Sequence, residues 1–260
     1  MVHWHHTFIY GIVVIVVLSW SRTFAQGAGL SETAEAYQWT DPDPIPIELE
    51  NLMPGYPSAV ARNDTIFLAF QANAMHESDI YLPKDVYVMQ YYNGNWTTPV
   101  NISRSTVSSA FPRLALADPG SANILYLIWG EQTTPELQLD GPPRPIIPDE
   151  IFCASLKKGG WSEPESLFRT NSRAIHLTRR LVSSEQGTLH FTFLAPDPVN
   201  RKPSIFYVRN EGDAWSAPKT IATGYEPELT RLENGRLLLA YIRADTIWAR
   251  RKRTRDVNSV

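Results

Sequence analysis

The sequence predicts an all-β protein, a β-propeller of four four-stranded blades, and a recurring motif carries most of that prediction. The motif, Trp-[Ser/Thr]-x-Pro-x-x-[Ile/Leu], occurs four times, at intervals of 57, 65 and 54 residues. It begins at Trp39, Trp96, Trp161 and Trp215. No segment has the apolar period of an amphipathic helix, whereas β-rich runs separated by turn residues are frequent. Four-stranded units repeated at this spacing are typical of propellers.

The first 25 residues are predicted to be a secretory signal peptide. Residues 8–20 are almost all apolar, but they are fewer than the ~20 residues that span a bilayer. Thr23 and Ala25 fit a cleavage site that follows small side chains. An uncleaved membrane anchor is the alternative, because the residues before the apolar run include no Lys or Arg.

The rest of the chain is predicted to be one linker and one domain. Residues 26–37 are small and polar and form the predicted linker, and residues 38–260 form the predicted propeller domain. We therefore expect a secreted or periplasmic protein without membrane association after signal cleavage. If the signal is retained, we expect a membrane-anchored protein.

The composition narrows the classes of partner. The chain has 27 acidic and 24 basic residues and a net charge of −3, so no nucleic-acid partner is expected. Cys153 is the only cysteine, which excludes an intramolecular disulfide, and we predict a buried, inert thiol. No cofactor and no metal are expected, and His76, Glu77 and Asp79 are interpreted as scattered loop charges.

Each blade is predicted from four β-rich runs, which we name strands A to D in chain order. In strand C an aliphatic residue precedes the motif Trp by ten positions: Val86, Ile151 and Ile205. Turn-forming residues lie between them, as in a hairpin. Strand B is predicted at residues 66–70, 124–129, 189–194 and 237–242. Strand A opens near an aromatic-Pro or similar signal at positions 56–57, 111–112, 177–178 and 225–227.

The strand count predicts how the ring closes. Strands A to C of a last blade occupy residues 228–250, and no Trp motif follows them. The unmatched motif is at Trp39, so residues 39–47 are predicted to be strand D of the last blade, which would remove an exposed sheet edge. The alternative is an eight-bladed ring shared by two chains. A monomer or a homodimer is expected accordingly.

The motif residues are predicted to have structural roles. Trp is expected to wedge between neighbouring blades, and the next Ser or Thr to bond the turn backbone. Pro has no N–H and suits an edge strand. The Ile or Leu at the seventh position is expected to lie in the core between blades.

The repeat resembles the bacterial neuraminidase repeat of the sialidase-like propellers. That family has a Ser-x-Asp-x-Gly-x-x-Trp box in the turn between strands C and D. The third blade is most similar, with Asn210 at the Asp position, Gly212 and Trp215 in register, and Val208 in place of Ser. The boxes at the two preceding Trp residues lack that Gly. The resemblance implies a propeller in which the box is a fold element on the face opposite the active site.

The resemblance also implies where ligands bind. Sialidases of this kind clamp a carboxylate with three arginines and use a Tyr–Glu pair and an acidic residue. Arginine suits this task because its fork bonds both carboxylate oxygens. Strand A lines the channel of a propeller, and the candidate ligand-binding residues there are Arg113, Arg179, Arg180 and Glu228. Among them Arg113, Arg179 and Glu228 are the weak catalytic candidates; the alternative is that all are paired or solvated strand ends.

Function is therefore predicted at the level of a ligand class. We expect a secreted sialidase-like propeller that binds a ligand on its loop face, with carbohydrate as the favoured class of ligand. The alternatives are an exo-acting glycoside hydrolase of sialidase type and a protein-binding scaffold. A binding module is favoured over an enzyme, because the motifs are degenerate and fold does not imply function.

Overall fold

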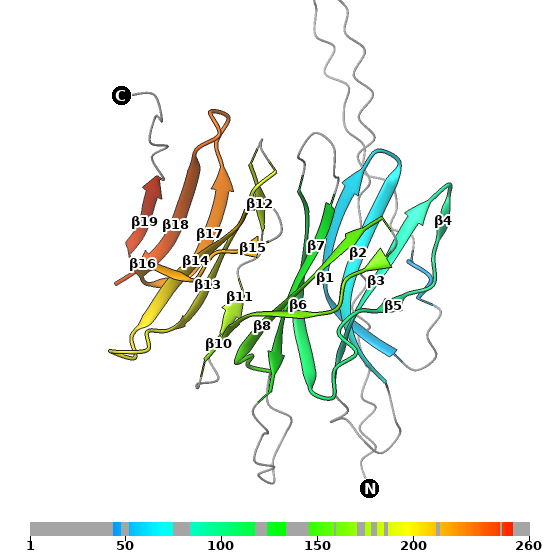
Figure 1. Cartoon of the computed structure of the whole chain (residues 1–260), viewed down its shortest axis with the longest axis horizontal. Helices are drawn as coiled ribbons and strands as arrows, with labels where there is room; N and C mark the ends of the chain where they lie inside the picture. The colour runs from blue at the N-terminus through cyan, green and yellow to red at the C-terminus, as the bar shows by residue number, and fades with distance from the viewer. Residues whose placement is uncertain are drawn as a thin grey trace, which may run out of the picture. The chain divides into compact units, whose positions relative to one another are not determined.

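The protein is all-β in the residues that the computed structural model describes, and it contains four antiparallel sheets (Figure 1). The described residues are 44–47, 52–74, 84–117, 124–133, 146–158, 160–170, 175–177, 181–184, 187–211, 214–244 and 246–251. The chain divides into two units, residues 1–47 and 48–260. In the first unit, residues 44–47 have irregular backbone. The second unit holds all four sheets.

Each sheet is an antiparallel meander that corresponds to one blade. Blade 1 comprises β1 (Leu52–Arg62), β2 (Thr65–Ala74), β3 (Asp85–Tyr92), β4 (Asn95–Trp96) and β5 (Val100–Asn101). Blade 2 comprises β6 (Ser108–Ala117), β7 (Ile124–Gln132), β8 (Glu150–Lys157), β9 (Gly160–Trp161) and β10 (Glu165–Arg169). Blade 3 comprises β11 (His176–Leu177), β12 (Val182–Ser183), β13 (Leu189–Pro196), β14 (Pro203–Glu211), β15 (Ala214–Trp215) and β16 (Lys219–Thr223). Blade 4 comprises β17 (Tyr225–Arg231), β18 (Leu237–Arg243) and β19 (Thr246–Arg251).

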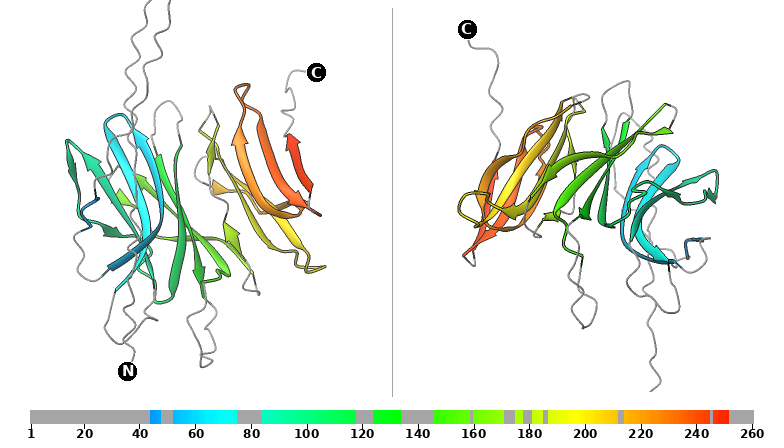
Figure 2. Two further views of the ribbon diagram at one scale, coloured as in Figure 1. Left: turned by 180° about the vertical axis from the view of Figure 1, so that it is seen from behind. Right: turned by 60° about the horizontal axis from the view of Figure 1, so that its bottom comes forward.

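The four sheets form a four-bladed β-propeller, as the sequence predicts (Figures 1 and 2). Strand A of blade 1 (β1) lies beside strand A of blade 2 (β6), and the blade-3 strand β12 lies beside both β6 and β17. Strands A therefore meet at the inside of the fold. Blade 4 has three strands among the described residues, matching the expected strands A to C.

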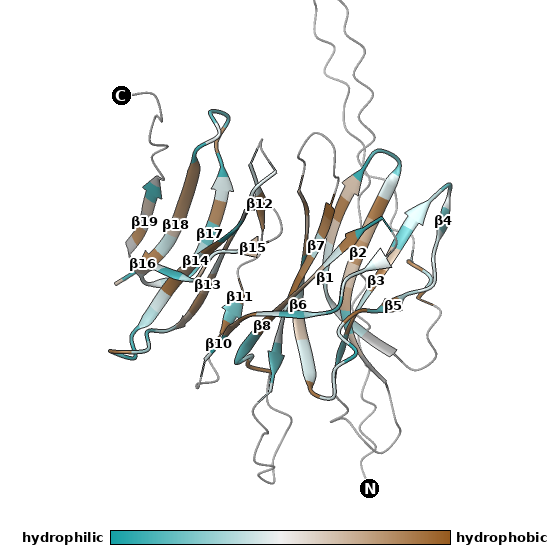
Figure 3. Ribbon diagram, viewed as in Figure 1, coloured by the Kyte–Doolittle hydropathy of each residue, from teal (hydrophilic) through white to brown (hydrophobic). Residues whose placement is uncertain are grey.

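Apolar cores lie between successive blades, and strands that contribute to them, such as β7 and β18, are largely hydrophobic in Figure 3. Between blades 1 and 2, the core includes Leu127 and the fully buried Trp129, whose ring stacks on Phe152 at 5.9 Å. Between blades 2 and 3, three phenylalanines of β13 and β14 dominate, and leucines of β17 and β18 pack on β14 between blades 3 and 4. Because apolar burial is the main favourable term in folding, these cores hold the blades in sequence.

The Trp motif divides strand D of blades 1 to 3 into two short pieces. In each blade the Trp ends the first piece, and the Ser or Thr that follows bonds one residue of strand C twice. The Ser162 N–H donates to the Ser155 carbonyl at 2.8 Å, and its Oγ accepts the Ser155 N–H at 3.0 Å. Thr97 bonds Gln90, and Ser216 bonds Arg209, in the same way. The hydroxyl thus replaces a carbonyl of the strand ladder, rather than bonding the turn as expected.

The other motif residues contribute to the cores between blades. Trp161 packs in the core between blades 1 and 2, and Trp215 packs in the core between blades 2 and 3. Trp96 instead contacts Tyr91 of its own blade, with ring centroids 5.2 Å apart. At the seventh position, Ile102 is buried. Leu167 and Ile221 pack against the cores that border their blades.

Several sequence predictions fall outside the described residues. These are the signal peptide, the linker, Trp39, and residues 39–43 of the predicted closing strand. The described part of that segment, residues 44–47, forms no strand, and closure by this segment stays a prediction. No helix among the described residues is long and apolar enough to cross a membrane.

Cys153 is buried on β8, as predicted. Desolvation raises the pKa of its thiol far above the ordinary value, the nearby Glu165 carboxylate raises it further, and a hydrogen bond from the Trp215 indole lowers it. The thiol is therefore protonated and unreactive under ordinary conditions.

Replacing Ser162 by Ala tests the structural role of the motif hydroxyl. Because the Ser155 N–H loses its acceptor, we expect the free energy of unfolding to fall by about 1 kcal/mol. Chemical denaturation measures this. Ser162→Thr keeps the hydroxyl and should retain most of the stability; equal losses in both variants would contradict the assigned role.

Candidate ligand-binding site on the inner strands

Strand A carries the same irregularity in three blades, a β-bulge at an Xaa-Pro pair. The pairing register skips between Gly55 and Ser58 in β1, between Ala110 and Arg113 in β6, and between Tyr225 and Glu228 in β17. In each blade two residues of strand A oppose one aromatic residue of strand B: Phe70, Trp129 and Tyr241. Such bulges re-aim side chains and are frequent beside active sites.

The residue before each proline has a left-handed backbone. The φ angles are 53° at Tyr56, 57° at Phe111 and 47° at Glu226. This conformation is uncommon for side chains other than Gly, Asn and Asp, and each instance costs on the order of 1–3 kcal/mol. Strain repeated at one place in three blades points to a functional position.

In blade 3, strand A consists of two short strands, β11 and β12. Leu177 of β11 pairs with Phe193, and Val182 of β12 pairs with His190. Arg179 and Arg180 follow β11 in the sequence and lie outside the described residues. Their predicted role in binding is therefore untested by the structure.

Blade 1 holds the bulge of blade 2 with two side chains. The Gln71 Oε1 accepts the Phe111 N–H at 3.0 Å, and the Ser58 Oγ accepts the Leu114 N–H at 3.0 Å. Gln71 is buried. These bonds give partners to an N–H group in the bulge and to one shortly after it. A strained segment persists only where its surroundings hold it, and here the neighbouring blade does so.

The bulges of blades 1 and 2 also share an aromatic contact. The rings of Tyr56 and Phe111 meet edge to face with their centroids 4.8 Å apart. Tyr56 is 55% exposed, so part of this aromatic pair faces solvent. On blade 4, Tyr225 at the start of the bulge is 51% exposed.

The register places Arg113 and Glu228 at equivalent positions. Each directly follows the proline of its bulge, and Ser58 occupies the same place in blade 1. Both charged residues are half-buried. The Arg113 guanidinium donates to the Pro112 carbonyl at 2.8 Å. This bond holds the guanidinium close to the backbone of the bulge. Binding of a ligand by Arg113 or Glu228 stays a prediction.

Sequence reasoning overlooks Glu131, a buried carboxylate at the end of β7 near this site. Its oxygens accept hydrogen bonds from the Ser105 hydroxyl at 3.0 Å, the Ser109 hydroxyl at 3.1 Å and the Trp129 indole at 2.9 Å. Desolvation is the largest influence and raises the pKa of Glu131; the three hydrogen bonds lower it, and the charge of Glu150 raises it. The only feature of the sequence that could have indicated Glu131 is the position of an acidic residue at the end of an apolar strand.

The position of Glu131 gives it a structural task. Ser105 lies between blades 1 and 2, and its backbone N–H also donates to the Asp85 carboxylate at 3.3 Å. Ser109 lies on β6, two residues before Phe111. Glu131 therefore fastens the start of strand A of blade 2 to β7, next to the bulge.

The base of the longest loop between strands B and C is closed by side-chain contacts. The Thr133 N–H and hydroxyl both donate to the Asp149 carboxylate, at 2.7 and 2.9 Å. Pro148 lies so close to Gly130 that a Cβ added there would meet it at 2.6 Å. These contacts anchor the loop at the end of β7 that carries Glu131.

The described residues include no group of three or more His, Cys, Asp and Glu side chains that would hold a metal ion. His76, Glu77 and Asp79 lie outside the described residues.

Comparison with known structures shows the fold. A Hadza microbial sialidase, Hz136, superposes with a TM-score of 0.58 and 14% identity, over 78% of this chain and 45% of that chain. An ulvan lyase of polysaccharide lyase family PL25 superposes with a TM-score of 0.50 and 15% identity, over 76% of this chain and 52% of that chain. This chain spans about half the length of these proteins. No protein-family model and no curated protein matches it. The protein thus has the propeller fold seen in these carbohydrate-active proteins.

A double-mutant cycle tests whether Gln71 and Ser58 hold the bulge as one unit. Gln71→Met leaves the Phe111 N–H without its acceptor, so we expect a loss of about 1–3 kcal/mol in unfolding free energy. Ser58→Ala should have a smaller effect. Because both act on one bulge, denaturation should show an interaction energy of about 0.5 kcal/mol or more. Strict additivity would contradict a shared function.

The pH dependence of stability tests the state of Glu131. Because its pKa is raised in the folded protein, the protonated native state is favoured relative to the unfolded chain. That stabilisation is complete below the unfolded glutamate pKa of about 4.3 and is lost as the pH rises through the folded pKa. Relative to Glu131→Gln, the wild type should therefore lose stability as the pH rises. If the difference in stability between the two proteins did not change with pH above the unfolded glutamate pKa of about 4.3, the raised pKa would be contradicted.

Proposed function

We propose that this protein binds carbohydrate on the inner-strand bulges, at the face of the propeller where the loops between strands B and C emerge. The observation that carries the proposal is the bulge itself, repeated with aromatic and charged side chains. Tyr56 and Phe111 supply aromatic surface, and Arg113, Glu226 and Glu228 supply charges of both signs. Ligand sites combine apolar and aromatic walls with a few well-placed polar groups.

The rigidity of the bulges supports the proposal. Gln71 and Ser58 hold the bulge backbone in place before any ligand arrives. A preformed site does not have to order its own backbone on binding, so more of the contact energy appears as affinity. Arg113 would recognise a carboxylate on the glycan, because its guanidinium bonds both oxygens of such a group.

The structural neighbours give further support. The sialidase and the ulvan lyase with this fold are named for action on carbohydrates, and we extend the ligand class, not the reaction, to this chain. Secretion is part of the proposal and depends on the predicted signal peptide. The alternative is a glycoside hydrolase of sialidase type, because Tyr225 and Glu226 adjoin on the bulge of blade 4. A protein-binding scaffold is the remaining possibility.

Native mass spectrometry of the protein mixed with sialylated and neutral oligosaccharides tests the proposal. We expect intact complexes with carboxylate-bearing glycans. Arg113→Ala should lower the affinity about tenfold or more, since one hydrogen bond to a charged group is worth about 1.5–3 kcal/mol. Arg113→Lys should also bind less well, because lysine lacks the planar fork. Arg231→Ala, at an exposed position at the end of β17, is the control.

The alternative outcomes are distinct. Cleaved glycan that depends on Glu226 or Glu228 would establish the hydrolase. Neither complexes nor cleavage would overturn the proposal and favour the scaffold. Unfolding midpoints of the Arg113 variants separate a lost ligand contact from a lost fold.

A further inference from the structure

A cavity lies between blades 2 and 3, near the turns that join strands C and D. Its volume is about 170 Å³. From blade 3 it is bordered by Asn210 and Trp215, which pair with each other at the tip of the β14–β15 hairpin. The inner-strand bulges lie toward the opposite ends of the strands, so this cavity is separate from the proposed glycan site.

The cavity lies beside the break in strand D of blade 2. Ser162, Glu163 and Pro164 separate β9 from β10, and Ser162 and Glu163 line the cavity. Ser155 and Lys157 on β8 line it as well. Trp215 closes the other side, and its ring meets that of Tyr126 edge to face with centroids 6.1 Å apart.

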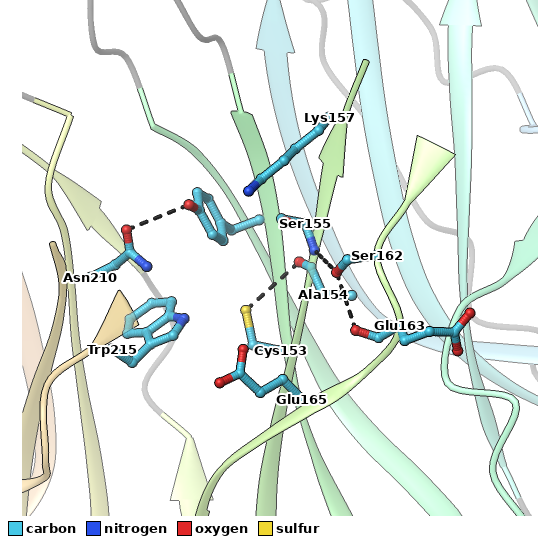
Figure 4. Close-up of a pocket in the computed structure, with 10 residues that line it drawn as sticks. Cys153, Ala154, Ser155, Lys157, Ser162, Glu163, Glu165, Asn210 and Trp215 are labelled. Atoms are coloured by element: carbon cyan, nitrogen blue, oxygen red, sulfur yellow. Dashed lines mark hydrogen bonds between the residues drawn. The ribbon is translucent and has the colours of Figure 1, made fainter. Parts of the chain in front are cut away.

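Two side chains of opposite charge, Lys157 and Glu165, line the cavity. Figure 4 shows the Lys157 ammonium and the Glu165 carboxylate reaching into the space that Asn210 and Trp215 border. The carboxylate of Glu163 points away from Asn210 and Trp215 in the same view. The Tyr126 hydroxyl donates to the Asn210 Oδ1 at 3.5 Å, which is long for such a bond. Asn210 is only 3% exposed, and the part of it that borders the cavity adds a neutral polar group.

These features select a class of ligand. A purely anionic ligand would meet Glu165, and a purely cationic ligand would meet Lys157. A hydroxyl both donates and accepts, so it pairs with an ammonium, a carboxylate or an amide alike. The volume is below the ~300 Å³ at which drug-sized pockets begin, which limits the ligand to about one ring. An aromatic wall beside such groups is typical of small-molecule sites.

We propose that this cavity binds a single neutral, polyhydroxylated ring, the size of one monosaccharide unit. Lys157 and Glu165 of blade 2 and Asn210 of blade 3 would bond its hydroxyls, and Trp215 would cover its apolar side. With the inner-strand site this makes a two-site carbohydrate binder, in which a branched or long glycan that reaches both sites gains avidity.

Saturation-transfer NMR with the protein and the methyl glycosides of glucose, galactose and mannose tests the proposal. At least one of them should bind, and Lys157→Met and Glu165→Gln should each weaken that binding about tenfold. Both residues are exposed, so these variants should stay folded. The matched controls Lys158→Met and Glu233→Gln, at exposed positions outside the cavity, should bind normally.

An inner-strand variant and two charged sugars distinguish the cavity from the inner-strand site and test its preference for a neutral ligand. Arg113→Ala should leave monosaccharide binding in the cavity unchanged even where it abolishes binding at the inner strands, so the two sites can fail independently. Glucuronate and glucosamine, which carry one charge, should bind more weakly than glucose. The proposal is overturned if no glycoside binds, if binding is insensitive to both cavity variants, or if a charged sugar is preferred.

Discussion

Two hydrogen bonds between the motif Ser or Thr and strand C determine where strand D of a blade ends and restarts. They tie the chain to strand C at the point where it leaves the ladder, at Thr97, Ser162 and Ser216. Once that point is fixed, the preceding Trp ends one short strand and the seventh residue returns to the core between blades. Proline lacks an N–H, and it occurs at a position where no neighbouring strand accepts a hydrogen bond. One local motif thereby sets blade geometry and the packing between blades.

Strain at the inner strands is balanced across blade boundaries. The left-handed residues Tyr56 and Phe111 occur next to each other in space, although 55 positions separate them in the sequence. The side chains that hold the second bulge, Gln71 and Ser58, come from the first blade. A bulge in an isolated blade would lose those partners, so its conformation depends on the assembled propeller. This dependence couples the shape of the site to the packing of the blades.

The sequence predicts the features whose signals are local. Motif spacing predicts the blades, and the Xaa-Pro signal of strand A predicts the places of Arg113 and Glu228, because each depends on residues a few positions apart. The positive φ before the prolines is not predicted, since Xaa-Pro alone favours extended backbone. Gln71 and Glu131 are also missed, because Gln71 acts on a residue 40 positions away and Glu131 on residues 22 and 26 positions away. Such contacts follow from register between strands, which local patterns do not specify.

The two proposed sites arise from two different departures from regular pairing. The bulges add residues to strand A, and aromatic and charged side chains lie at the added residues or directly after them. The motif interrupts strand D of blade 2 between β9 and β10, and Ser162 and Glu163 of this break line the cavity that the next blade borders with Trp215. In this fold, therefore, the irregularities of the outer strands and the inner strands provide the concave surfaces that a ligand requires, while the regular strands B and C between them carry the core.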